Sequence, residues 1–515
     1  MERFSDSNLI SRPNGTGGQS SPPNAARSAD PLAARSPDER EYLTLAVSLS
    51  ETGELRLPTG EVAKRPPLYP ALLSLIQRSQ PPETWHSAAI LMQSLLAWCN
   101  TLLIALIAAK IADARAGLIA GFIAALYAPL LYLQTLFLTE TVVIFLLLAA
   151  TLTFIATIIS ENAARASNQP TSVNSPRHAK ASRSKLPLAM VSALIGLATL
   201  ARPNAVLFLF PFAAHQLWHM RKKPRHLLID AIALTLPAAL LLGAWTLRNQ
   251  QLLGRPTLST IGGLNLYLGH NSDFASNPGL DHADYDRFDR VRREQHLTEL
   301  QTDDLLKREA FQFIAANPRQ MLLNTLTKIK VWFTPTIPSF GPLLPLILSG
   351  ICLVAGWRRR PTSSSQTSQA GAEQKSPTFT PINAGVGPTI SRDDANGINQ
   401  EALPWRWLVT IAFAVFLFAY IAHLTSSSYR KLPLISPTHV LLLGGPALIL
   451  FRIRLPVRGL LIALVVTQMI VALAFIPLSR IRWTIDPIFI IAIAVATSHF
   501  CNLLKTRRKQ HPFQA

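Results

Sequence analysis

The chain of 515 residues is poor in cysteine and in charge. Its three cysteines, Cys99, Cys352 and Cys501, lie far apart in apolar runs and offer neither a disulfide framework nor a metal spacing. Charged residues make up only 15% of the chain, which is low for a soluble protein. The 12 histidines include no pair with convincing ligand spacing, and a phosphate-binding loop of the Walker type is absent. We therefore expect no metal and no cofactor.

Long apolar runs dominate the chain instead. Apolar types make up 49% of it, and runs such as 138–159 and 456–476 reach the roughly 18–20 residues that a helix needs to cross a bilayer. A soluble core would interrupt such runs with polar faces. We predict an all-α polytopic membrane protein with about eleven transmembrane helices. The predicted spans are 87–110, 116–134, 138–160, 186–201, 204–219, 227–247, 340–357, 405–424, 433–452, 456–478 and 483–503.

The net charge of +20 could indicate nucleic-acid binding, but the distribution of the charge indicates a membrane instead. Basic residues gather in segments that alternate with less basic ones, as the positive-inside bias requires. The segments expected inside are 161–185, 220–226, 358–403, 452–458 and the C-terminal tail. The outer face then receives 36–86, Glu140, Arg202, 248–338, 425–432 and 478–482.

The same patterns divide the chain into soluble and membrane parts. A Ser, Thr, Gly and Pro-rich composition predicts disorder in the N-terminal tail and in one linker. We predict a disordered tail at 1–35, an outer first loop with an acidic helix at 36–86, a transmembrane bundle at 87–247, an outer loop with amphipathic helices at 248–338, a transmembrane helix at 340–357, a disordered inside linker at 358–403, C-terminal transmembrane helices at 405–503 and a basic cytoplasmic tail at 504–515.

The first outer loop begins with Ser36-Pro37-Asp38-Glu39, a pattern typical of a helix N-terminus. Ser36 fits the N-cap, Pro37 the first helical position and Glu39 the acid of a capping box, while Asp38 complements the helix dipole. Gly53 is expected to end this helix. A purely structural role is therefore sufficient for this segment. Capping uses Glu39, however, and leaves Asp38 to face a cavity, so both interpretations stay open.

Four further charges are candidate site residues. Lys64 and Arg65 precede two prolines and either anchor a helix at the headgroups or hold a lipid phosphate. Glu140 begins a span, where it either complements the helix dipole or serves a site. Arg202 lies between two apolar runs, where a half-buried cation usually has an anionic partner.

The outer loop 248–338 contains two predicted helices. Thr302 is a plausible N-cap of the first, and Asn317-Pro318 ends it and starts the second. The second is expected to lie on the membrane surface with Met321, Leu322, Leu326 and Trp332 on its apolar face. Asp284 and Asp286 have the Asp-x-Asp spacing of a metal site, but their charged neighbours favour a solvated surface.

Taken in order, several blocks resemble the GT-C glycosyltransferases, and in particular the aminoarabinose transferase and protein O-mannosyltransferase (family 39-type) group. The blocks are "DEREYLTLAVSLSETGEL…KRPPLYPALLSL", "LYLQTLFLTETVVIFLLL", "GLATLARPNAVLF", "AWTLRNQQLLGRPTLSTIGGLNLYLGHN", "AFQFIAANPRQMLLNTLTKIKVWF", "SSSYRKLPLISPTHVLLL" and "SRIRWTIDPIFIIAIAVA". The resemblance runs from about residue 37 to about residue 500. The family also places a transmembrane helix before the acidic loop, and residues 1–35 contain no apolar run of that length.

The resemblance implies an inner-membrane enzyme that transfers a sugar from a polyprenyl-phosphate donor to a lipid, glycan or protein acceptor on the outer, periplasmic face. It implies that Asp38, with Glu39 beside it, is the catalytic or acceptor-binding acid. It also implies that Lys64 and Arg65 approach the donor phosphate and that Glu140 is a further site acid; we add Arg202 to the phosphate site. A secondary transporter or flippase is the alternative without catalysis, and a glycan polymerase or ligase is the alternative enzyme.

Overall fold

The computed structural model describes the chain in several segments. They are residues 34, 36–167, 185–220, 224–272, 274, 286–333, 440, 443–445, 447–448, 455–475 and 482–510. The predicted spans 340–357 and 405–424, the linker 358–403, most of the span 433–452 and nearly all of the tail 1–35 lie outside the described residues.

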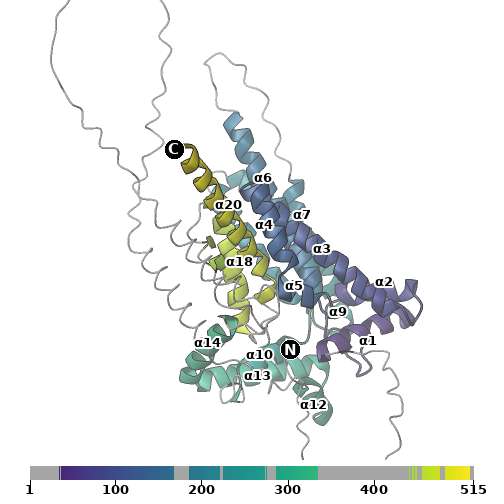
Figure 1. The fold of residues 1–515 in the computed structure, drawn as a ribbon. Helices are drawn as coiled ribbons and strands as arrows, with labels where there is room; N and C mark the ends of the chain where they lie inside the picture. The colour runs from purple at the N-terminus through teal and green to yellow at the C-terminus, as the bar shows by residue number, and fades with distance from the viewer. Residues whose placement is uncertain are drawn as a thin grey trace, which may run out of the picture.

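The regular elements of these residues are helices (Figure 1). Those that form the long bundle are α3 (Trp85–Ile111), α4 (Ala114–Ala125), α5 (Ala128–Leu133), α6 (Glu140–Ser167), α7 (Leu186–Ala201), η1 (Pro203–Phe208), α8 (Leu209–Met220), α9 (Pro224–Leu253), α18 (Leu455–Ala474) and α20 (Asp486–Gln510). Those that gather at one end of it are α1 (Pro37–Thr52), α2 (Leu68–Ser79), α10 (Gly262–Gly269), α12 (Arg287–Glu294), α13 (Glu299–Ala316) and α14 (Pro318–Phe333). We call this end of the bundle the capped end.

The described residues form helices, several of which are long and apolar enough to cross a bilayer, as predicted for a helical membrane protein. Four of the described helices are long and apolar enough: 85–111, 140–162, 227–253 and 457–474. Shorter apolar helices occupy 114–125, 186–201 and 486–502. The number of eleven spans is not confirmed.

Two of the predicted spans are wrong as single helices. The span 116–134 breaks after Ala125, because Tyr127 is extended (ψ 109°) and α5 restarts with Pro129 in its first turn. The span 204–219 begins as the 3₁₀ helix η1 and becomes α-helical only at Leu209. Both breaks lie toward the capped end, where irregular backbone surrounds a cavity.

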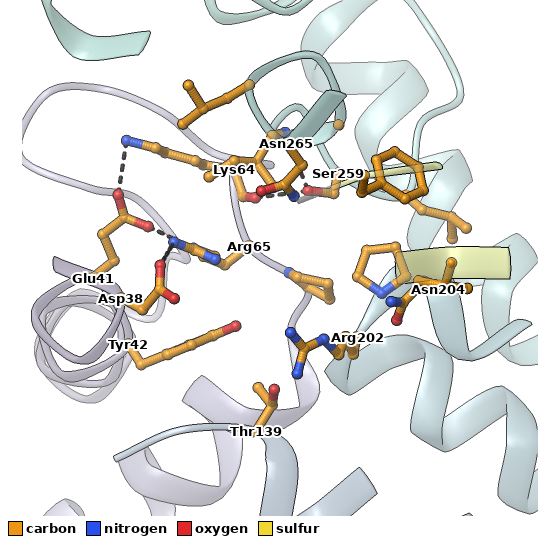
Figure 2. A pocket seen from close by; sticks show the side chains of 18 of the residues that line it. Asp38, Glu41, Tyr42, Lys64, Arg65, Thr139, Arg202, Asn204, Ser259 and Asn265 are labelled. Carbon is orange, nitrogen blue, oxygen red and sulfur yellow. Dashed lines mark hydrogen bonds and ion pairs between the residues drawn. The ribbon is translucent and has the colours of Figure 1, made fainter. Parts of the chain in front are cut away.

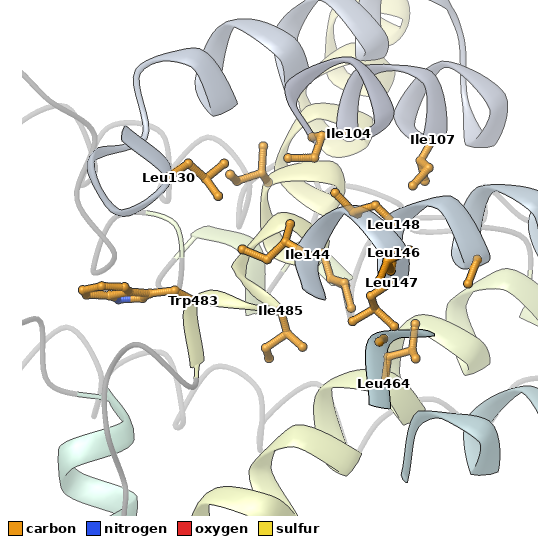
Figure 3. Packing of buried hydrophobic residues seen from close by; sticks show 14 of the residues in the cluster. Ile104, Ile107, Leu130, Ile144, Leu146, Leu147, Leu148, Leu464, Trp483 and Ile485 are labelled. Atoms are coloured by element: carbon orange, nitrogen blue, oxygen red, sulfur yellow. The ribbon is translucent and has the colours of Figure 1, made fainter. Parts of the chain in front are cut away.

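The bundle core is a continuous apolar cluster between α3, α4, α6, α7, α18 and α20 (Figure 3). Ile104 of α3, Ile144 of α6 and Leu464 of α18 are each fully buried in it. The outer sides of α3 and α9 instead expose large apolar side chains, among them Leu91, Leu95, Trp98, Leu236, Leu240 and Leu247. Apolar surface of this extent is typical of helices that face lipid tails.

Helices α7 and α9 approach each other closely near Pro237, which interrupts the hydrogen bonding of α9. The amide of Ala238 donates to the Ser192 hydroxyl at 3.1 Å. Gly196 permits this contact, because a Cβ placed there would lie 2.9 Å from the Cα of Ala238. A backbone atom cannot move aside as a flexible side chain can.

Gly196→Val is therefore expected to lower the free energy of unfolding by about 1–3 kcal/mol through overpacking. Thermal unfolding of the purified protein in detergent measures the loss. Gly243→Val is the matched control, since a Cβ at Gly243 in α9 meets nothing within 4 Å. Equal unfolding temperatures for the two variants would contradict the close approach.

Candidate active site

A cavity of about 530 Å³ opens at the capped end of the bundle. Five of the predicted site residues line it: Asp38, Lys64, Arg65 and Arg202, which Figure 2 labels, and Glu140. These residues come from α1, the segment before α2, the start of α6 and the end of α7. Glu39, the sixth, is buried (1% exposed) but does not line the cavity.

Helix α1 presents one polar face to the cavity. Its start is the predicted cap, since the Ser36 hydroxyl accepts from the Glu39 amide at 3.3 Å, and Gly53 ends the helix with φ 75°. Glu41 and Tyr42 follow Asp38 by three and four residues and therefore share its face. All three line the cavity. The structural and the site interpretations of this segment are thus compatible, because they use different residues.

The segment that carries Lys64 and Arg65 is not helical, and its backbone is held by partners from distant parts of the chain. The buried carboxylate of Glu299 in α13 accepts from the amides of Val62 and Ala63 at 3.3–3.5 Å. On the other side, the Thr260 amide donates to the Ala63 carbonyl at 3.0 Å, and the Ser259 hydroxyl to the Lys64 carbonyl at 2.7 Å. Burial raises the pKa of Glu299, and the two amides oppose that shift.

Lys64 and Arg65 each form ion pairs with two carboxylates. Lys64 Nζ lies 2.8 Å from Glu41 and 2.8 Å from Asp289, and the Arg65 guanidinium lies 2.5 Å from Glu41 and 2.5 Å from Asp38. Burial alone would lower the pKa of both cations. The acids more than compensate, so that the pKa of Lys64 is raised and that of Arg65 is raised well above its usual value. Both side chains therefore remain cationic at any physiological pH.

Tyr42 of α1 lines the cavity and packs against Arg65 and Tyr69. Arg65 stacks over its ring at 5.3 Å, and the Tyr69 ring meets it edge-on at 5.2 Å. Burial raises the pKa of the Tyr42 phenol, with Arg65 opposing the shift. Tyr42 thus offers a neutral hydroxyl that can donate a hydrogen bond to an anionic ligand.

Glu140 and Arg202 form an ion pair on the far side of the cavity, with Arg202 Nη1 2.8 Å from Glu140 Oε1. Arg202 reaches this place because Pro203 forces it out of the helical region (ψ 115°), which ends α7. Its carboxylate partner is almost fully buried, at 2% exposed. The sequence expectation that Arg202 has an anionic partner is confirmed.

Two side-chain amides of α3 hold the backbone on either side of Glu140. Gln93 Nε2 donates at 2.5 Å to the Leu136 carbonyl in the loop before α6, and Asn100 Nδ2 donates at 3.2 Å to the Thr141 carbonyl in the first turn of α6. The two donors are seven residues apart and therefore lie on one face of the helix. Gln93 satisfies irregular backbone that the surrounding apolar core could not.

Part of the cavity lining is apolar. It includes Leu138, Val206, Leu207, Leu264, Val471 and Phe475 from four separate segments. A cavity lined by both charged and apolar side chains suits an amphiphile that carries an anionic head on a hydrocarbon chain.

The structure adds site residues that the sequence analysis missed. Glu41 and Tyr42 could have been found from their helical spacing to Asp38, whereas Asp289 and Glu299 come from α12 and α13 and leave no local signal. Helix α13 begins at Glu299 with Thr298 as its capping-box residue, so the predicted N-cap Thr302 is wrong by four positions. The predicted break at Asn317-Pro318 is confirmed.

Two further sequence predictions concern α14 and metals. On α14, Leu322 and Leu326 are exposed as predicted, but Trp332 is buried (4% exposed) and belongs to the core. Among the described residues, no group of three or more His, Cys, Asp or Glu is placed to hold a metal ion. Asp284 lies outside the described residues, and Asp286 is the N-cap residue of α12.

A second polar cluster closes the capped end of α18. Lys328 Nζ donates to the Leu473 carbonyl at 2.9 Å, and His270 Nε2 lies 3.1 Å from the Ala474 carbonyl. Lys328 Nζ is also 3.0 Å from His270 Nε2. Burial lowers the pKa of Lys328 to about 7; burial and the neighbouring ammonium lower that of His270 to about 4. The last carbonyls of α18 are thus capped by an amine that titrates near neutrality.

Lys328 should make the stability of the protein depend on pH. Its pKa is about 7 in the folded chain against an ordinary value of 10.5, so the unfolded chain binds the proton more tightly. Stability should therefore rise with pH between about 7 and 10.5, by on the order of a few kcal/mol in total. In Lys328→Met this part of the rise should disappear, as measured by thermal unfolding in detergent at pH 7 and pH 9.5. Lys110→Met, at an exposed lysine of α3, should keep it.

Comparison with known proteins returns solved structures alone. No family model matches the chain, and no curated protein matches it. The apo oligosaccharyltransferase of Archaeoglobus fulgidus is similar at 12% identity and a TM-score of 0.43, over 92% of this chain and 47% of that one. The same organism's oligosaccharyltransferase AglB, in complex with an inhibitory peptide and a dolichol-phosphate, is 13% identical with a TM-score of 0.40, over 92% and 48%.

ArnT of Cupriavidus metallidurans in the apo state is 11% identical with a TM-score of 0.30, over 90% of this chain and 73% of that one. The neighbours are members of the GT-C superfamily that the sequence resembles. This chain spans about half the length of the oligosaccharyltransferase chains.

Proposed function

We propose that the protein is an integral membrane glycosyltransferase. In this proposal it transfers a sugar from a polyprenyl-phosphate donor to a lipid, glycan or protein acceptor at the capped end, which faces the outside of the inner membrane. One observation carries the proposal: a single cavity with a partly apolar lining brings Asp38 together with Lys64, Arg65 and Arg202. The cations suit the phosphate, the apolar lining suits the polyprenyl chain, and the carboxylate suits the acceptor hydroxyl.

The reaction is a displacement at the anomeric carbon of the donor sugar. The acceptor oxygen forms a bond to that carbon, the bond from the carbon to the phosphate oxygen breaks, and polyprenyl monophosphate leaves. The acceptor hydroxyl loses its proton, and we assign Asp38 as the carboxylate that orients the hydroxyl and receives it. Charge grows on the leaving phosphate, which preorganised cations stabilise more strongly in the transition state than in the bound donor.

The ion pairs of the cavity impose an order on these events. Arg65 contacts Asp38 at 2.5 Å, so the proposed catalytic acid is paired with a proposed phosphate-binding cation. The donor phosphate has to engage Arg65 before Asp38 can turn to an acceptor. Donor binding therefore precedes acceptor activation in this scheme.

Asp38→Asn is expected to lower transfer by roughly 10²-fold or more, because an amide cannot accept the proton. Its amide oxygen still accepts a hydrogen bond from Arg65, so the variant should accumulate in the membrane like the wild type. The measurement compares the envelope glycans of a strain lacking the protein with strains that express the wild type, Asp38→Asn or the control Glu51→Gln. Mass spectrometry should show one sugar restored by the wild type and the control only. Restoration by Asp38→Asn would refute the assignment, and unchanged glycans in all strains would favour a transporter.

Arg65→Ala is expected to weaken use of the donor, raising its apparent KM by roughly tenfold or more through loss of a charge-assisted contact. Arg65→Lys should recover part of the loss, because lysine keeps the charge without the paired hydrogen bonds. The assay is transfer by the purified full-length protein with a titrated polyprenyl-phosphate sugar. Arg56→Ala removes an exposed arginine (50% exposed) from the same loop and should leave KM unchanged. An unchanged donor KM in Arg65→Ala would contradict phosphate binding by Lys64 and Arg65 and would favour their interpretation as membrane anchors.

A further inference from the structure

One carboxylate of the cavity, that of Glu41, contacts both candidate phosphate-binding cations, Lys64 and Arg65. Glu41 Oε1 lies 2.8 Å from Lys64 Nζ, and Glu41 Oε2 lies 2.5 Å from Arg65 Nε (Figure 2). Asp38 contacts Arg65 at 2.5 Å, and Asp289 contacts Lys64 at 2.8 Å. The bridge made by Glu41 is what two adjacent oxygens of a phosphate would make.

The positive charges of Lys64 and Arg65 are already compensated by carboxylates. In the described residues, two cations, Lys64 and Arg65, contact three carboxylates, Asp38, Glu41 and Asp289. An incoming phosphodiester would add a further negative charge to a group of side chains that is largely buried. Like charges at such distances repel strongly when water is excluded. A phosphate can therefore enter only if one carboxylate withdraws.

We propose that Glu41 is a positioning residue that occupies the phosphate's place on Lys64 and Arg65 and exchanges with the donor phosphate. Glu41 is the member best suited to withdraw. Asp38 is needed for the acceptor, and Asp289 approaches Lys64 from α12, outside the lining of the cavity. Glu41 is 17% exposed on a flexible stem and keeps the two cations compensated while no ligand is present. This inference rests on the proposed function.

The exchange also bears on product release. Transfer converts a phosphodiester with one negative charge into a phosphomonoester with up to two, which the two cations hold more tightly. A carboxylate that returns to Lys64 and Arg65 competes with this product and helps it leave. Glu41 should therefore weaken the binding of donor and product alike, with the larger effect on the product.

Glu41→Gln tests the proposal, because glutamine has the same shape but cannot compete as an anion. The probe is undecaprenyl phosphate in detergent, titrated onto the full-length protein by calorimetry, with uncharged undecaprenol as the control ligand. We expect Glu41→Gln to bind the phosphate roughly three- to tenfold more tightly than the wild type, with undecaprenol binding unchanged. In transfer assays, the donor KM and kcat should both fall, and undecaprenyl phosphate should inhibit more strongly. Glu51→Gln, an exposed acid on the same helix, should leave all these values unchanged.

Glu41→Asp gives a second, independent variant. The shorter side chain keeps the charge but cannot reach both cations, so its affinity for undecaprenyl phosphate should lie between those of the wild type and Glu41→Gln. Weaker or equal binding in both variants would overturn the exchange and would identify Glu41 as a permanent support, while the proposed function would stand. A wild-type protein that does not distinguish undecaprenyl phosphate from undecaprenol would overturn both proposals.

Discussion

Charges buried at the end of an apolar bundle have to be paired, and this constraint shapes the whole cavity. Transferring an ion out of water costs far more than one hydrogen bond returns, so each charge requires a partner in contact. Glu140 meets Arg202 at 2.8 Å, and Lys64 and Arg65 are compensated by acids from α1 and α12. The same pairing determines what the cavity can bind. Cations that are shielded from water interact strongly with an anion that displaces their carboxylate partners.

Irregular backbone at this depth obeys a parallel constraint. A helix satisfies its own amides and carbonyls, but the segment at 62–65, which carries Lys64 and Arg65, and the segment at 134–139, which leads to Glu140, are not helical. Glu299 accepts from the first segment, Gln93 donates to the second, and Asn100 donates to the first turn of α6 directly after it. These buried polar side chains act indirectly, because they hold in place the backbone that carries the charged side chains of the cavity.

The sequence predicted the parts of the molecule that are local. Apolar runs located α3, α6, α9 and α18, and the cap at Ser36 and the glycine at Gly53 bounded α1. It did not predict the break after Ala125 or the 3₁₀ start of the span 204–219, since apolar composition continues through both. The spans between 340 and 452 lie almost entirely outside the described residues and stay predictions.

For the site, the sequence selected charged residues that the fold does bring to one cavity. Their roles stay proposals, and their mutual contacts could not be predicted. The contact of Arg65 with Asp38 joins residues 27 apart in the chain, and that of Lys64 with Asp289 joins residues 225 apart. Such pairs depend on how α1 and α12 pack against the bundle, and the hydrophobic periodicity of the sequence does not determine that packing.

The cavity lining joins Asp38 of α1 to Phe475, the residue that follows α18. During synthesis, α1 and α2 leave the ribosome long before α18 exists, so the lining cannot close until α18 has been inserted. A nascent chain thus cannot acquire a closed binding site before α18 has packed against the helices that precede it.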